Sequence, residues 1–322
     1  DDLGPIQQSM GKLANDMRVF ESKPAYLVEG GRYRGDTPLG ENPPSGVLIH
    51  YYLPKDMSDT DLTMLILDKN DNIIRTYKNK ADKNYKRYEG GPQPEPVFDA
   101  KKGVNRFVWD FRRETAPGVP GVFINGDYRG SRVAPGDYKV RLVTPEGNVE
   151  QAVTVVKDPR VEATPQDYAA QQEVLVQLDR TIIEAHNAVN NMREVREQIQ
   201  NLNASLKNVD GAKDLVKIGE DVIKKINEWE EMIIQPKQKT FQDVINFYNR
   251  MTAEMMNLRG RVDQYNPKVT GGAKERLSDL VREWDTHRNT MNKLITEDIA
   301  KYNKMYLEQN FPAINIPKVS RP

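Results

Sequence analysis

The spacing of apolar positions changes once along this chain, near residues 158–160. Before that point apolar and polar residues alternate, as in residues 138–143, and a period of two predicts β-strands. From Thr164 onward apolar residues recur every three or four positions, and this period predicts helices almost to the end of the chain. The pattern therefore predicts a multidomain protein with β structure first and α structure second.

The first half contains six apolar or alternating runs and one short run, separated by turns. Asp68–Asn72 is rich in Asp and Asn, which favour turns, so it predicts a hairpin between two of these runs. The arrangement is typical of an immunoglobulin (Ig)-like antiparallel β-sandwich over residues 46–160. The predicted strands are 47–53, 62–67, 73–77, 104–111, 138–143 and 149–156, with a short edge strand at 24–28.

Three other segments of this half lack regular periodicity. Residues 1–45 are rich in Gly and Pro and predict an extended linker that wraps between modules. Loops 78–98 and 112–134 are long and rich in Gly, Pro and polar residues, so we expect them to be exposed and to offer the best contact surface.

The second half predicts an antiparallel four-helix bundle over residues 164–310. Thr164 can cap the first helix, and Pro165 suits the first helical position because its missing N–H is not needed there. A second helix is expected to end before Pro236. A third is expected to start at Thr240, and a fourth follows Gly271. Residues 311–322 are punctuated by Pro and predict an extended tail.

Composition excludes several classes of function. Among 322 residues, 47 are basic and 47 acidic, and the charges also balance within each half, so the electrostatic footprint of a nucleic-acid-binding module is missing. No apolar run reaches the roughly 20 residues that span a bilayer. The absence of Cys excludes disulfides, thiolate catalysis and Cys-bound metals. The chain starts Asp-Asp-Leu-Gly-Pro, which favours a piece of a longer precursor.

No catalytic residue, metal site or cofactor site is predicted from the remaining polar residues. Asp110 is interpreted as a structural carboxylate that bonds loop N–H groups or neighbouring arginines. His186 lies near the apolar stripe of the first helix, but Ile183 stands where a Glu-x-x-His metal motif requires Glu, so the histidine is expected to be packed.

Aromatic residues supply the candidate ligand-binding positions. His50 and Tyr52 lie in a predicted strand whose aromatic face is able to stack a sugar. Tyr88 and Tyr128 lie in the two long loops and are candidates for an exposed aromatic platform. Half-buried strands and packed loops have the same composition, so a purely structural role is the alternative.

One sequence pattern resembles a known family. Gly103-Val104-Asn105-Arg106-Phe107-Val108-Trp109-Asp110, followed by a Gly/Pro loop and then Pro135-Gly136-Asp137-Tyr138-Lys139-Val140-Arg141-Leu142, is similar to a signature of FlgD-like Ig modules. The same signature occurs in the C-terminal region of bacterial secreted proteins with BNR/sortilin (VPS10)-like β-propellers, which are often labelled glycosyl hydrolases. The resemblance covers about residues 1–205, including the junction Val155–Val161.

The resemblance implies structural roles for Trp109, Asp110, Pro135, Gly136 and Tyr138. It implies a non-catalytic accessory region of a larger protein, secreted or in the bacterial cell envelope. Such a region serves domain packing, assembly, or recognition of a partner or glycan, and its partners are the N-terminal propeller of the parent chain and other envelope proteins. The alternative is part of a glycoside hydrolase whose active site lies in a propeller N-terminal to this chain. A third reading treats the helices as an independent homo-oligomerisation unit.

Overall fold

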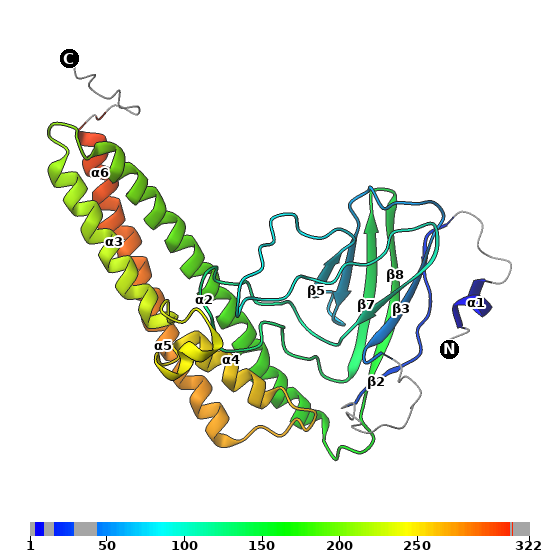
Figure 1. Cartoon of the computed structure of the whole chain (residues 1–322). Helices are drawn as coiled ribbons and strands as arrows, with labels where there is room; N and C mark the ends of the chain where they lie inside the picture. Colours follow the sequence, from blue (N-terminus) through cyan, green and yellow to red (C-terminus); the bar gives the residue numbers. More distant parts are fainter. Residues whose placement is uncertain (1–3, 10–15, 29–43, 310, 312–322) are drawn as a thin grey trace.

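A computed structural model of the chain describes residues 4–9, 16–28, 44–309 and 311. After the short helix α1 (Gly4–Ser9), strands occupy the first half, and the long helices follow from residue 165 (Figure 1). The predicted order of β structure followed by α structure is confirmed.

The strands form two sheets. One has three antiparallel strands in the order β1-β3-β6, and the other has five in the order β2-β8-β7-β4-β5. The pair β2–β8 is parallel and the other pairs are antiparallel, so the expectation of a purely antiparallel arrangement is wrong for that pair. The strands are β1 (Arg18–Val19), β2 (Ala25–Leu27), β3 (Val47–Leu53), β4 (Thr63–Leu67), β5 (Ile73–Lys78), β6 (Gly103–Trp109), β7 (Gly136–Thr144) and β8 (Gly147–Lys157).

The two sheets share one apolar core. Alternate residues of β3 are buried, and they pack with buried residues of β4, β6, β7 and β8. Trp109 lies at the centre, with its ring edge-on to Tyr138 at 5.4 Å and its Nε1 donating to the Arg112 carbonyl at 2.9 Å. The Tyr138 hydroxyl donates to the Ala134 carbonyl at 2.7 Å, which holds the start of β7 at Gly136, directly after Pro135.

Residues 1–45 do more than link modules. The segment contains α1 (Gly4–Ser9) and then adds β1 to one sheet and β2 to the other. The short edge strand expected at 24–28 is therefore confirmed, and a purely extended linker is wrong. Residues 1–3, 10–15 and 29–43 lie outside the described residues.

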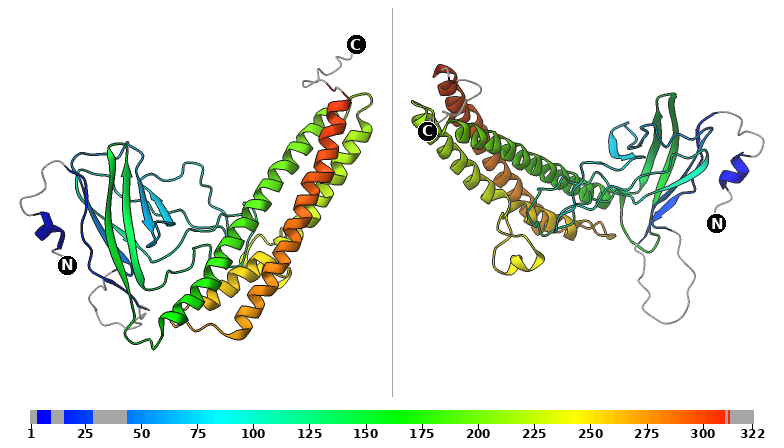
Figure 2. Two further views of the ribbon diagram at one scale, coloured as in Figure 1. Left: turned by 180° about the vertical axis from the view of Figure 1, so that it is seen from behind. Right: turned by 45° about the horizontal axis from the view of Figure 1, so that its top comes forward.

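The helices form an arm that extends away from the sheets (Figure 2). Its longest helix has 42 residues, or about 63 Å at 1.5 Å per residue. It begins with a capping box, in which the side chains of Thr164 and Asp167 bond each other's backbone N–H. The helices are α2 (Pro165–Leu206), α3 (Lys213–Ile233), α4 (Met251–Val262), α5 (Gly271–Lys293), the π-helical turn η2 (Leu294–Ile299) and α6 (Ala300–Glu308).

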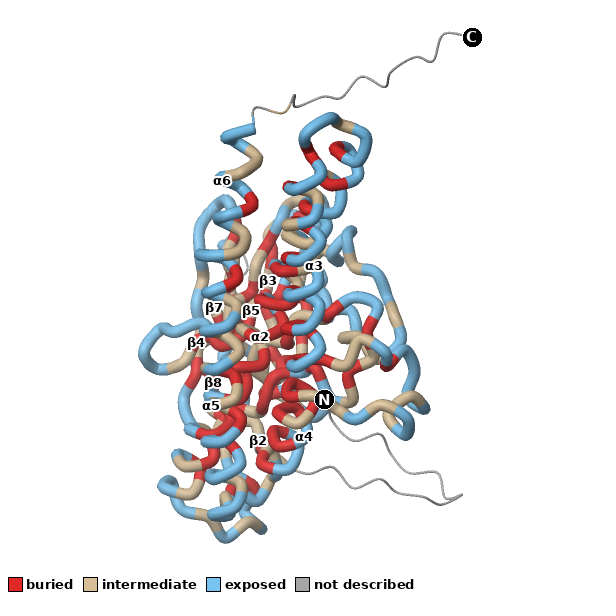
Figure 3. The backbone as a smooth tube through the Cα atoms, turned by 90° about the vertical axis from the view of Figure 1, so that its left-hand side faces the viewer, coloured by how far each residue is buried: buried red, intermediate tan, exposed pale blue. Residues whose placement is uncertain are grey.

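Helices α3 and α4 cover successive halves of α2. On the C-terminal half, Arg196 of α2 is 2.7 Å from Glu230 of α3. On the N-terminal half, Gln171 donates to the carbonyl of Val262 in α4. Helix α5 contacts α2, α3 and α4, and η2 and α6 continue along α3. Buried positions lie on the facing sides of these helices and between the sheets (Figure 3).

The prediction of a third helix that starts at Thr240 is wrong over residues 241–250. The capping box of Thr240 opens only the short 3-10 helix η1 (Phe241–Ile245), and α4 starts at Met251. The buried side chain of Gln238 donates to the Phe247 carbonyl at 2.6 Å, and Gln235 donates to the Tyr248 carbonyl at 3.3 Å. These amides replace helical hydrogen bonds, so the segment stays in a loop.

The end of the arm is only partly described. The ring of Phe311 lies 6.3 Å from that of Tyr306 on α6. The extended tail expected at 311–322 otherwise lies outside the described residues.

Candidate functional site

Loop 112–134 lies between the sheets and the arm. Its apolar residues share the core of the helices, so the expectation that this loop is an exposed contact surface is wrong. Apolar burial against α2 explains the difference, because a Gly/Pro-rich segment still hides apolar side chains where a helix face is available. The buried members are Ala116, Val119, Val122, Ile124 and Tyr128.

Side chains of α2 hold the loop by its backbone. His186 Nδ1 lies 2.7 Å from the Pro117 carbonyl, Asn190 donates to the Gly118 carbonyl at 2.9 Å, and Arg193 donates to the Pro120 carbonyl at 2.8 Å. Spacings of four and three place these side chains on one face of α2. The periodicity of α2 predicts that face, but the partners are carbonyl groups, which no sequence pattern marks.

Asp263, directly after α4, holds both ends of the loop. Its carboxylate accepts from Arg112 at 3.2 Å and from Arg132 at 3.1 Å. The Arg132 guanidinium also lies over the Tyr265 ring at 4.0 Å. Asp263 contacts both arginines, and Arg132 contacts Tyr265. The loop and the arm are therefore joined through polar groups as well as through apolar packing.

A cavity of about 840 Å³ opens beside this loop, and we call it the junction pocket. It lies between β5 and β6 and is walled by residues 91–96 and 125–129. Its volume is within the range of small-molecule sites. The charged lining residues are Arg75, Arg112, Arg129, Glu95, Asp110 and Asp127, and the polar and apolar walls include Gln93, Asn125, Pro92, Pro94, Pro96, Tyr77 and Val108.

Each arginine of the pocket is bound to a carboxylate of the protein. Arg75 contacts Glu95, and its Nη1 donates to Thr115 at 2.7 Å and to the Arg113 carbonyl at 2.9 Å. Arg129 donates to both oxygens of Asp127 at 3.1, 3.0 and 2.7 Å. Since Arg112 binds Asp263, none of these guanidinium groups presents an uncompensated charge to the cavity.

The carboxylates keep accessible oxygens. The side chains of Glu95, Asp110 and Asp127 are each about half exposed. Burial opposes ionisation of Asp127, but the hydrogen bonds from Arg129 outweigh it and hold the pKa of this carboxyl below its usual value. Burial raises the pKa of the Tyr77 hydroxyl, and the nearby charge of Asp110 raises it further. The pocket therefore presents the ionised Asp127 carboxylate beside a neutral phenol.

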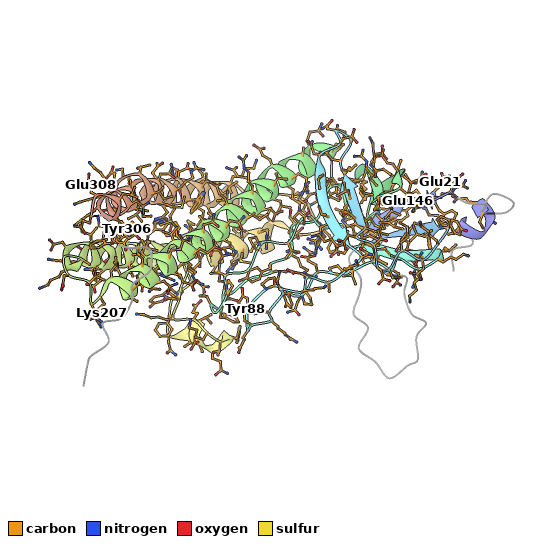
Figure 4. All side chains as sticks on the ribbon, turned by 90° about the horizontal axis from the view of Figure 1, so that it is seen from above. Glu21, Tyr88, Glu146, Lys207, Tyr306 and Glu308 are labelled. Atoms are coloured by element: carbon orange, nitrogen blue, oxygen red, sulfur yellow. The ribbon has the colours of Figure 1, made fainter. Side chains whose placement is uncertain are left out.

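The four aromatic candidates lie in two separate places. His50 and Tyr52 are half-buried on the outer face of β3. Tyr88 is half-buried in the loop next to η1, in the region labelled in Figure 4. Tyr128 is 5% exposed and its ring lies 5.8 Å from that of His186. Because Tyr128 is buried, it does not form an exposed platform with Tyr88.

Asp110 and His186 each make polar contacts with loop 112–134. Asp110 accepts from the Arg112 backbone N–H at 3.3 Å and its carboxylate is 3.9 Å from the Arg112 side chain. His186 is fully buried, and burial, with the charge of Arg259 adding to it, lowers its pKa to about 4 against the opposing bond to Pro117. Both side chains therefore take part in joining the loop to its neighbours.

The segment around η1 is the second candidate surface. Phe241, Ile245 and Tyr248 are 64%, 84% and 86% exposed, and we call them the η1 knob. The Phe241 ring packs edge-on against Phe123 at 6.2 Å, and Lys239 donates to the Gly121 carbonyl at 2.6 Å. Large apolar side chains gathered in this way are unusual on the surface of an isolated domain. The apolar residues of this segment are visible in the sequence, but the predicted helix from Thr240 placed Phe247 in a core and so hid the exposed surface.

Comparisons with known proteins give little further information. No protein-family description and no curated protein matches the chain. Among solved structures it is matched to "pT26-6p" with a TM-score of 0.14 and 9% sequence identity, over 82% of this chain and 46% of that one. The chain thus spans less than half the length of that protein, and a likeness at this level carries no argument.

None of the helices in the described ranges is both long enough and apolar enough to cross a bilayer. No group of three or more His, Asp or Glu side chains in that part of the chain is arranged to hold a metal ion.

Proposed function

We propose that this chain is a non-catalytic recognition and assembly region of a larger bacterial protein. In this proposal the two sheets are an Ig-like sandwich, and the helices are an antiparallel four-helix bundle in which α3 and α4 follow one another along α2. The single shared core of the sheets and the contacts of α2 with α3, α4 and α5 support this reading.

The exposed η1 knob is the observation that carries the proposal. Phe241, Ile245 and Tyr248 are exposed, while the buried Gln238 and the capping box of Thr240 hold the loop that displays them. A loop that is anchored by buried polar groups, yet displays large apolar side chains, is suited to binding a protein surface. The partner we propose is the N-terminal propeller of the parent chain.

The junction of loop 112–134 with α2 supports the same role. Buried polar contacts fix the arm relative to the sheets, so both units present their surfaces in one orientation. A fixed orientation lowers the entropy lost on binding. The proposed location, secreted or in the cell envelope, rests on the resemblance of residues 103–142 to secreted propeller proteins.

Co-elution of the chain with the separately produced propeller tests the proposal. We expect a complex with the native chain and at least tenfold weaker binding by the triple variant Phe241→Ser, Ile245→Ser, Tyr248→Ser. The matched control is Val104→Ser, which changes an exposed apolar residue on β6 and leaves binding unchanged. Equal binding by the triple variant and the native chain contradicts the role of the knob.

The hydrolase alternative makes a different prediction. In that case the active site lies in the propeller, and the propeller with this chain attached hydrolyses a glycoside, whereas the chain alone does not. Hydrolysis by the chain alone would contradict the non-catalytic proposal.

A further inference from the structure

The junction pocket differs from the η1 knob in chemistry and place. It is lined by residues of the sheet part and of loop 125–129, and its polar groups converge on one cavity of about 840 Å³. Convergent polar groups in a cavity of this size indicate a small ligand rather than a protein surface.

The charges of the pocket decide the class of ligand. Arg75, Arg112 and Arg129 are each bound by a carboxylate of the protein, so an anionic ligand would have to compete with Glu95, Asp263 or Asp127. The lining holds three arginines and three carboxylates, so it carries no net charge that would attract a cationic ligand. An uncharged ligand neither competes with these carboxylates nor depends on a net charge in the pocket.

The free hydrogen-bonding groups add a second requirement. An ionised carboxylate has about four acceptor sites, and those of Asp110 and Glu95 are only partly used. The side-chain amides of Gln93 and Asn125 make no hydrogen bond with the part of the chain that the structure describes, and each offers both donors and an acceptor. The ligand must therefore carry several groups that donate and accept, as hydroxyls do.

The walls of the junction pocket also suit a sugar ring. Pro92, Pro94 and Pro96 form a rigid apolar side, which suits the C–H faces of a sugar ring. The wall formed by residues 125–129 is held in place because Arg259 of α4 donates to the Asp127 carbonyl, so these residues are organised before a ligand arrives.

We infer that the junction pocket binds a neutral saccharide, with Asp110, Gln93 and Asn125 as its hydrogen-bonding partners. The inference rests on the proposed recognition role and names the class of ligand that this pocket takes. It also assigns sugar binding to the junction of sheets and arm rather than to the outer face of β3.

Calorimetric titration with cellotetraose, xylotetraose, mannotetraose and chitotetraose tests the inference, with trigalacturonate and inorganic phosphate as charged probes. We expect at least one neutral tetrasaccharide to bind, and to bind at least tenfold more weakly to Asn125→Ala and to Gln93→Ala. Both side chains lie outside the apolar cores, so circular dichroism should show the native fold. The matched control is Tyr52→Ala on β3, which should leave binding unchanged.

Three results would overturn the inference. These are no binding by any of the four neutral sugars, binding of only the charged probes, and loss of sugar binding in Tyr52→Ala but not in Asn125→Ala. The propeller assay with the η1 knob variant is independent of these titrations. Absence of sugar binding with an intact propeller complex therefore refutes this inference alone, and loss of both refutes the proposed function as well.

Discussion

Asp179 of α2 and Arg259 of α4 form an ion pair in the interior, with 2.8 Å between Oδ1 and Nη1. The other oxygen of Asp179 accepts from the backbone N–H of Ser131 at 3.0 Å and from its hydroxyl at 2.5 Å. Arg259 also donates to the carbonyl of Asp127. One buried pair thus joins two helices to residues 127–131 of loop 112–134, which lies between the arm and the sheets.

Removal of one partner of this pair should destabilise the protein strongly. Asp179→Ala leaves Arg259 buried without its counter-ion, which costs about 3–5 kcal/mol. Urea unfolding measures the change. The double variant Asp179→Leu, Arg259→Met should lose less stability than the sum of the single changes.

An exposed pair provides the control for this prediction. Asp279 and Arg282 on α5 are largely exposed, and Asp279→Ala should cost no more than about 1 kcal/mol. Equal effects of Asp179→Ala and Asp279→Ala would show that the junction contributes little to stability.

Acid should weaken the protein through His186. Its pKa falls from 6.5 to about 4 on folding, so the unfolded chain binds the proton more readily between these values. The contribution of His186 is complete above pH 6.5 and is lost as the pH falls toward 4. Urea midpoints at pH 7.5 and pH 4.5 measure the loss, and the loss should be smaller in His186→Gln. An identical pH dependence in the variant would contradict the assignment.

Two helical glycines should respond in opposite ways to alanine. A Cβ at Gly219 of α3 would lie 2.4 Å from Asn203 Nδ2. Asn203 donates to the Val216 carbonyl and accepts from the Tyr302 hydroxyl, so it has no free direction in which to move. Gly219→Ala should therefore destabilise the arm by about 1–3 kcal/mol despite better helix propensity.

Gly260 of α4 is the matched comparison. Apart from its sequence neighbours and the backbone of its own helix, no atom of the described residues lies within 4 Å of a Cβ at that position, so Gly260→Ala should stabilise the protein by up to about 1 kcal/mol. Thermal melting of both variants by circular dichroism separates the two cases. A stabilised Gly219→Ala variant would mean that α2 and α3 are packed less closely than the structure indicates.

Gln238 should control the order of the η1 segment. Gln238→Ala removes the amide that donates to the Phe247 carbonyl, and an unsatisfied buried group costs about 1–3 kcal/mol. Amide hydrogen exchange of residues 246–250 should become faster, while exchange in the sheets stays unchanged. Gln242→Ala, on the exposed side of η1, is the control and should leave exchange unchanged.

Much of the fold could be predicted from local patterns. The alternation in β3 and β7, the Asx turn at Asp68, and the capping box of Thr164 depend on neighbours in sequence, so each was visible there. The candidate site was less visible. The sequence predicts a structural role for Asp110, but it does not predict that Arg75 and Asn125 lie beside it, because a pocket depends on residues that folding brings together.

The sequence by itself determined the strands, most of the helices and the point at Asp158–Arg160 where one gives way to the other, because period and capping are local properties. Tertiary structure decided that loop 112–134 packs on α2, that residues 241–250 leave the helix, and that β2 pairs in parallel with β8. Each of these depends on contacts between residues far apart in the chain. A single backbone carbonyl or a buried amide carries no periodic signal, so only the folded chain reveals its partner.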